Sequence, residues 1–307
     1  MLWTKALSLL FSFLCLQLNA VDAYLLDDSC DSIAKDLKES MGKTMGMAKL
    51  AFEALNADND DNVKELRGWF FLDKDLGTVK NAYEYVQHYK TFGEGATDNA
   101  PSLTIYCDLS RMKEVKAKTT EDGEDEQKVH DTKNNVFRDR SASYEGCKDG
   151  DTIAYTSSFY KKDTEYMFIQ LCPWYLNELG YSQYKNVDGS LPDRTGQRRY
   201  DPSQAPTEKH PQADIFASRL DFLLLHELTH ALPVGEETED PAVDWHPCIA
   251  LRLKYGCMNA DSYAFFALGV RLIKEDKIKI NKKGELVALD APTTKRDGGM
   301  AMKLWEA

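Results

Sequence analysis

The sequence predicts an α+β fold in which helices cover a small mixed sheet. Between residues 28 and 92, apolar side chains recur at helical spacing. Short apolar runs at 103–107, 152–157 and 166–172 are typical of strands, and the last is apolar enough to lie inside a sheet. A longer apolar stretch at 211–232 predicts a buried helix. A chain of 307 residues with 43% hydrophobic residues is long enough to bury one substantial core.

The first residues of the chain resemble a secretory signal peptide. One lysine precedes an apolar run from residue 6 to 18, and small residues then allow cleavage after Ala20 or Ala23. That run is too short to span a bilayer comfortably, so we assign residues 1–23 to a removed signal. A net charge of −12 argues against nucleic acid or an anionic membrane as the main partner. We therefore expect a secreted monomer that makes no membrane contact once the signal is removed.

Cysteine usage agrees with export. Of the seven cysteines, Cys15 would leave with the signal, and an even number would remain. The six are Cys30, Cys107, Cys147, Cys172, Cys248 and Cys257. An exported chain with six cysteines predicts up to three disulfides. We expect Cys248 and Cys257 to pair, because they bracket a short segment beside the most informative motif.

Residues 24–95 form the predicted helical N-terminal region. Its first apolar stripe runs from Ile33 through Leu37 and Met41, and a second runs from Val79 through Tyr83. The segment DNDD at 58–61 predicts a turn between the two helices. The sequence leaves open whether this region is propeptide-like or an accessory helical part of the protein.

Residues 96–307 form the second predicted unit. Charge dominates at 113–133, where apolar residues nearly vanish, and we expect a solvated loop there. A calcium site is the alternative, but the spacing of the carboxylates matches no EF-hand loop. Residues 189–212 are rich in Pro, Gly and Asp and predict a long surface loop, either a wall of a substrate cleft or a plain connector.

The predicted helix at 211–232 contains the motif His226-Glu227-Leu228-Thr229-His230, an HExxH. Pro211 suits a first helical turn and Pro233 prevents continuation. Residues four apart lie one above the other on a helix, so both imidazoles can reach one Zn²⁺ at about 2.0–2.1 Å. Glu227 can then take a proton from activated water and deliver it to the leaving amine. The alternative, a pair of core histidines with polar partners, is costly in so apolar a helix.

A catalytic zinc site needs a third protein ligand and an open fourth position. The metzincin pattern is excluded, because Pro233 and Glu236 stand where that family has Gly and His. The downstream candidates for the third ligand are Glu236, Glu237, Asp240, Asp244, His246 and Asp261.

The motif and the residues after it resemble the deuterolysin-type fungal peptidases, the aspzincins, which include lysine-specific metalloendopeptidases. The resemblance rests on HELTH at 226–230, TED at 238–240, Cys248, and NADSYA at 259–264. It implies that Asp240, as the aspartate of a GTxDxxYG segment, is the third ligand. It also offers Asp261 either as an acceptor behind a ligating imidazole or as the third ligand itself.

The sequence also departs from that pattern. Glu237 replaces the glycine before the threonine, and Val243-Asp244 replaces the Tyr-Gly pair. The missing tyrosine is the one expected to stabilise the tetrahedral intermediate, and losing such a donor costs about 10²–10³ in rate. Tyr263, His246 or an upstream tyrosine are the candidates to replace it.

Together these observations predict a zincin-like α+β domain with an HExxH helix and an attached helical N-terminal region. One Zn²⁺ per chain would be held by His226, His230 and Asp240, with Glu227 as general base and acid. The expected activity is metalloendopeptidase hydrolysis of proteins or peptides. The alternatives are a secreted zinc-binding or surface protein with an inactive site, and a structural zinc site in an extracellular interaction domain.

Overall fold

We describe the fold from a computed structural model that covers residues 23–91, 103–119, 125–161, 164–181, 211–217, 219–232, 238–251 and 253–289. The predicted signal peptide, apart from Ala23, residues 189–210 of the predicted loop at 189–212, and the candidate ligands Glu236 and Glu237 lie outside these residues. The protein is a mixed α and β structure with small sheets, which agrees with the predicted class. Among the described helices, none combines the length and apolar character needed to cross a bilayer.

The main sheet has five strands in the order β2-β1-β3-β8-β7. These are β2 (Lys90–Thr91), β1 (Ala23–Leu26), β3 (Leu103–Tyr106), β8 (Thr164–Leu171) and β7 (Ala154–Lys161). The first four run parallel and β7 pairs antiparallel with β8, so the sheet is mixed, as predicted. Strand β7 ends the sheet and leaves one edge without a partner strand among the described residues.

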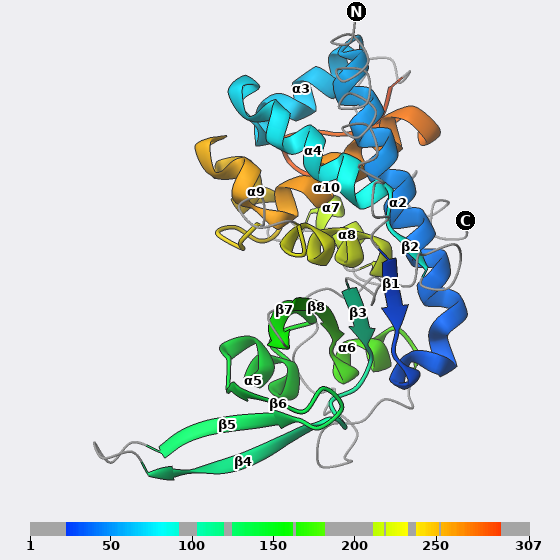
Figure 1. The fold of residues 1–307 in the computed structure, drawn as a ribbon. Coiled ribbons are helices and arrows are strands. Elements are labelled where there is room, and N and C mark those ends of the chain that lie inside the picture. The colour runs from blue at the N-terminus through cyan, green and yellow to red at the C-terminus, as the bar shows by residue number, and fades with distance from the viewer. Residues whose placement is uncertain are drawn as a thin grey trace, which may run out of the picture.

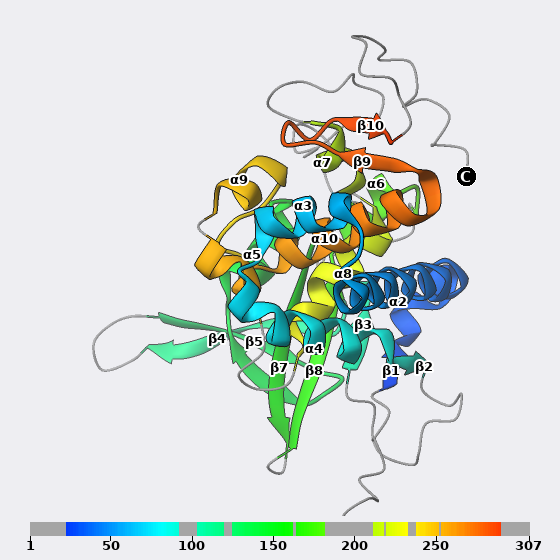
Figure 2. The same ribbon diagram turned by 90° about the horizontal axis from the view of Figure 1, so that it is seen from above.

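Helices form the layer above this sheet (Figure 1). The helices and turns between β1 and β2 are η1 (Asp28–Ile33), α2 (Ala34–Ala57), α3 (Asp61–Phe70), η2 (Asp73–Asp75) and α4 (Leu76–Gln87). Those from residue 212 onward are α7 (Gln212–Ala217), α8 (Leu220–His230), α9 (Trp245–Ala250), η3 (Leu253–Met258), α10 (Ala260–Arg271) and η4 (Leu272–Asp276). A hairpin of β9 (Ile278–Ile280) and β10 (Leu286–Ala288) lies beside α7, as seen from above in Figure 2.

The N-terminal region shares the core of the rest of the chain. Helix α2 packs against α8 and α10, and Thr44 donates a buried hydrogen bond to the carbonyl of Asp221 in α8 at 2.8 Å. Strand β1 lies between β2 and β3 in the main sheet. A disulfide joins Cys30 to Cys107 across 77 residues of sequence. Residues 24–95 therefore contribute strands as well as helices, and they are packed into the same unit as the HExxH helix.

The apolar stripes predicted for these helices are confirmed. Leu37, Met41, Val79 and Tyr83 are completely buried. The acidic turn also forms where expected: α2 ends at Ala57, and Asp60 caps α3 by accepting from the backbone N–H groups of residues 62 and 63.

The prediction of a loop at 113–133 is wrong for the part that the structure describes. Strands β4 (Met112–Thr119), β5 (Asp125–Asp131) and β6 (Val136–Asp139) form an antiparallel three-stranded sheet there. In Figure 1 the paired ends of β4 and β5 project away from the body of the protein. Such a projecting sheet has little core to cover, so its strands need few apolar residues and show no hydrophobic alternation.

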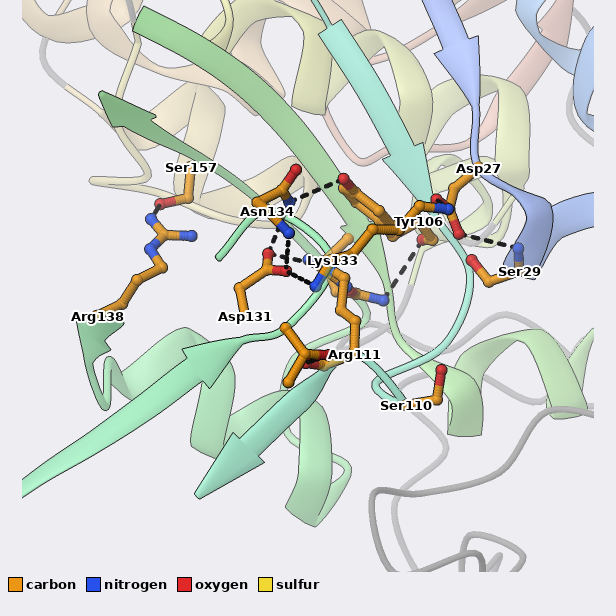
Figure 3. Close-up of polar contacts among 12 residues, drawn as sticks. Asp27, Ser29, Tyr106, Ser110, Arg111, Asp131, Lys133, Asn134, Arg138 and Ser157 are labelled. Atoms are coloured by element: carbon orange, nitrogen blue, oxygen red, sulfur yellow. Dashed lines mark hydrogen bonds and ion pairs between the residues drawn. The ribbon is translucent and has the colours of Figure 1, made fainter. Parts of the chain in front are cut away.

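A buried polar cluster joins this small sheet to the main sheet (Figure 3). Arg111 forms an ion pair with Asp131 at 3.1 Å and donates to the side-chain oxygen of Gln170 at 2.6 Å. Its guanidinium lies 3.6 Å above the ring of Tyr106, whose hydroxyl accepts from Asn134 at 3.0 Å. Because the Arg111 and Asp131 side chains are only 5% and 1% exposed, water stabilises neither charge well, and each charge is stabilised by the other.

Two predictions about the chain's covalent and helical structure need correction. The second disulfide joins Cys147 in α5 (Ala142–Asp149) to Cys172, just before α6 (Pro173–Glu178), while Cys248 and Cys257 are both free. The expected Cys248–Cys257 pair does not form, and the buried Cys248 thiol contacts the Asn259 amide and the Ala242 carbonyl.

The predicted single helix at 211–232 is divided into α7 and α8, because Arg219 adopts an extended backbone and starts α8 anew. The two helices contact different parts of the protein. Ala213 in α7 donates to the carbonyl of Gly284 near the β9–β10 hairpin, whereas α8 packs against α2, α10 and β7.

Candidate metal centre

Helix α8 directs the side chains of both histidines of the HExxH motif toward the same point. Residues 220–229 are all buried, as the prediction of a helix apolar on nearly every side requires. The rings of His226 and His230 stand one turn apart, nearly perpendicular, with centroids 4.9 Å apart. Their Nε2 atoms face each other at 3.2 Å. The helix therefore brings two imidazole nitrogens together, as the spacing predicts.

Asp240 adds a third ligand atom to this pair. Its Oδ1 lies 3.2 Å from Nε2 of His226 and 3.4 Å from Nε2 of His230. These three atoms form one group whose members all lie within 4.8 Å of one another. Four tetrahedral ligands about 2.0–2.1 Å from a zinc ion are about 3.3–3.4 Å apart, so the triangle has the dimensions of three zinc ligands.

The electrostatics of the triangle favour a cation at its centre. Burial lowers the pKa of His226, but the carboxylates of Asp261 and Asp240 outweigh burial and raise it well above the ordinary value. Burial also lowers the pKa of His230, and its bond to Asp240 more than compensates. Burial raises the pKa of Asp240, yet its contacts with the two imidazoles bring it below its usual range. Positive charge in this pocket, from protons or from a metal ion, is thus stabilised.

Asp261 lies behind His226, on the side away from Asp240. Its Oδ1 accepts from Nδ1 of His226 at 2.7 Å, and its Oδ2 accepts the backbone N–H of Asp244 at 2.9 Å. His230 has an equivalent partner, because its Nδ1 donates to the carbonyl of Thr238 at 2.8 Å. With a proton on each Nδ1, both Nε2 lone pairs point toward the triangle. Of the two roles open to Asp261, the geometry fits the acceptor behind the ring.

The segment that carries Asp240 is fixed to both neighbouring helices. Thr238 donates its N–H to Thr229 of α8 at 3.2 Å, and the two threonine hydroxyls are 2.8 Å apart. Glu239 forms a parallel bridge to Asn259 at the start of α10. The backbone directly before Asp240 is therefore held by hydrogen bonds to α8 and to the start of α10.

Glu227 points from α8 toward the main sheet. Its carboxylate is 2% exposed and accepts from the hydroxyl of Thr156 in β7 at 2.8 Å, through Oε2. Burial raises the pKa of Glu227, while the neighbouring His226 and His230 partly oppose that rise. A buried carboxyl with a raised pKa beside a candidate metal site is suited to accept a proton.

A cavity of about 320 Å³ opens beside the triangle. His226, Glu227, His230, Asp240 and Asp261 all contribute to its lining. Its apolar wall includes Ala217, Phe222, Leu223 and Val243, and its lining contains no lysine or arginine among the described residues. The cavity provides the open side that a fourth, exchangeable ligand requires.

Other sequence candidates lie outside the triangle. Asp244 lines the cavity but reaches the site only through its backbone N–H. His246 is absent from the cavity lining, and Tyr263 is completely buried with its hydroxyl donating to the carbonyl of Cys257 at 2.9 Å. Neither therefore occupies the place of the expected tyrosine, where Val243 lines the cavity.

Sequence reasoning missed Thr156. Its hydroxyl is the one side-chain partner of the Glu227 carboxylate among the described residues. A single threonine in a strand carries no motif, so only the packing of β7 against α8 reveals it. Comparison with models of known protein families and with curated proteins found no match to this chain.

Proposed function

We propose that this protein is a secreted zinc-dependent metalloendopeptidase of the zincin type, related to the deuterolysin-like peptidases. The observation that carries the proposal is the triangle of His226 Nε2, His230 Nε2 and Asp240 Oδ1, with sides of 3.2–3.4 Å. Two imidazoles and one carboxylate with an open side are the donor set of catalytic zinc sites. When bound, Zn²⁺ supplies a Lewis acid that polarises a carbonyl and makes water acidic enough to react at neutral pH.

The chain's own residues would then perform the proton transfers. Glu227 would take the proton of the attacking water, because it lines the cavity beside the triangle and its pKa is raised by burial. The same carboxyl group delivers that proton to the leaving amine. Asp261 and Thr238 favour the tautomer of the two imidazoles in which Nε2 would be free to bind a metal.

The surroundings suit an extended peptide as substrate. Residues 154–156 of β7 line the cavity, and β7 is the end strand of the main sheet. An extended segment can add to such an edge through main-chain hydrogen bonds, which are independent of its sequence. The scissile bond of the peptide would then lie over the triangle, and one of the peptide's side chains would contact the apolar wall of the cavity.

The proposed secretion rests on the signal-like leader together with two disulfides. Disulfides such as Cys30–Cys107 and Cys147–Cys172 are typical of proteins in oxidising compartments outside the cytosol.

One observation favours a second candidate function, a zinc-binding protein with a weak or inactive peptidase site. Val243 lines the cavity where the resemblance calls for a tyrosine that donates to the tetrahedral intermediate. A closed structural zinc site is less suitable, because such sites take four protein ligands and leave no cavity beside the metal.

Casein hydrolysis by the purified secreted protein separates these functions. We expect cleavage that a chelator abolishes and zinc restores, and that Glu227→Gln reduces by about 10²–10⁴ while zinc remains bound. Glu53→Gln, an exposed change of the same kind on α2, is the matched control and should cleave normally. Zinc binding without cleavage by the wild type under any condition would favour the inactive alternative.

A further inference from the structure

Among the described residues, Thr156 is the one in the main sheet whose side chain hydrogen-bonds to the proposed general base. Strand β7 alternates its side chains between two faces of the sheet. Ser157 contacts Arg138 of the small sheet on one face, and Thr156 points to α8 on the other. Thr156 is paired with Ile169 of β8, so its position is fixed by the sheet rather than by α8.

The Thr156 hydroxyl lies within reach of two oxygens of the same residue. It is 2.8 Å from Oε2 of Glu227 and 3.0 Å from the Glu227 backbone carbonyl. That carbonyl lacks its usual helical partner, because the last turn tightens and Ala231 donates instead to Leu228 at 3.2 Å. The hydroxyl has one proton for these two acceptors, and the ionised carboxylate is the stronger acceptor.

The contact defines the orientation of the Glu227 carboxylate. With Oε2 bound to Thr156, Oε1 carries no hydrogen bond to any described residue. Glu227 lines the cavity, so Oε1 is the oxygen left to face a water above the triangle. Without the hydroxyl, the carboxylate can rotate about its terminal bond, a broad torsion with little preference of its own.

We infer that Thr156 is a positioning residue for the general base, and this inference rests on the proposed function. It holds one carboxylate oxygen against the sheet edge so that the other is directed at the reacting water. Residues 154–156 also line the cavity where the peptide is proposed to bind. Strand β7 would therefore position both the general base and the proposed peptide. A purely structural role, in which the hydroxyl serves only the Glu227 carbonyl, is the competing explanation.

The first test is a double-mutant cycle on unfolding of the metal-free protein. Thr156→Val removes the hydroxyl at constant shape, and Glu227→Met removes the carboxylate while leaving the backbone carbonyl in place. Each single variant changes the unfolding equilibrium constant by some factor. If the hydroxyl binds the carboxylate, the factor for the double variant should differ from the product of the two single factors by about tenfold or more. Effects that multiply independently overturn the inference, whether or not the protein is an enzyme.

The second test separates positioning from structure by kinetics. We expect Thr156→Val to lower kcat about 10- to 100-fold, with KM and zinc affinity unchanged. Thr156→Ser keeps the hydroxyl and should remain within about threefold of the wild type. An unchanged kcat for Thr156→Val, or an equal loss in both variants, overturns the inference. A wild type that cleaves nothing removes the proposed function and the catalytic role together, while the cycle still reports whether the contact exists.

Discussion

Asp214 offers a prediction in which pH and stability are linked. This carboxyl is 6% exposed, and its Oδ1 accepts the backbone N–H of Trp245 at 2.7 Å. Burial raises its pKa to about 7, the Trp245 bond opposes the rise, and the nearby Asp244 and Asp261 carboxylates add to it. The folded protein therefore holds a proton on Asp214 that the unfolded chain releases at much lower pH.

The direction in which stability changes with pH follows from this difference in pKa. Because the folded-state pKa exceeds the ordinary 3.8, the stability associated with the Asp214 proton is fully present below pH 4. It is lost as the pH rises toward 7. About three pKa units at about 1.4 kcal/mol each give an upper limit of about 4 kcal/mol. Asp214→Asn, which is neutral at every pH, should therefore be more stable than the wild type at pH 8 by about 2–4 kcal/mol, and nearly equal to it at pH 4.

Urea denaturation of the metal-free protein, followed by tryptophan fluorescence at pH 4.5, 6 and 8, measures this difference. Glu53→Gln removes one exposed charge and should stay within about 0.5 kcal/mol of the wild type throughout. The reasoning is refuted if Asp214→Asn gains nothing at pH 8, or if it gains the same amount at pH 4.5 as at pH 8.

Three further predictions concern residues around the two sheets and the candidate centre. Asp131→Ala leaves the Arg111 charge buried without its partner and should cost about 3–5 kcal/mol of unfolding free energy, measured by urea denaturation. Asp244→Gly should stabilise the protein by about 1–2 kcal/mol, because Asp244 has φ 69° and ψ 164°, a region that essentially only glycine occupies; a loss in the same assay would contradict this. Asp261→Asn should weaken zinc binding about 10- to 100-fold in a chelator competition, because it alters the acceptor behind His226; unchanged affinity would exclude that role.

Much of the fold was predictable where one physical signal dominated. The α8 helix was recognisable because it is apolar on nearly every side, and the predicted core strands at 103–107 and 166–172 were recognisable because they are buried. The small sheet of β4, β5 and β6 was missed because projecting strands such as these are rich in charge and lack an apolar face. Strand β1 was missed because four residues are too few to show a period.

The candidate site was predictable only in part. Helical spacing alone brings His226 and His230 together, but Asp240 is ten residues further on and was reached through a resemblance, not through spacing. Its place in the triangle depends on backbone bonds to Thr229 and to the start of α10, which no local pattern contains. Thr156 depends on how β7 packs against α8, so the sequence offered no signal for it.

The most direct test of this account is the position of the metal itself. Crystals of the zinc-loaded protein, measured at the zinc absorption edge, should show one anomalous peak about 2.0–2.1 Å from Nε2 of His226, Nε2 of His230 and Oδ1 of Asp240. Asp261 should remain bonded to Nδ1 of His226, outside the coordination sphere. No peak at this position, or a peak bound to Asp261 in place of Asp240, would contradict the account.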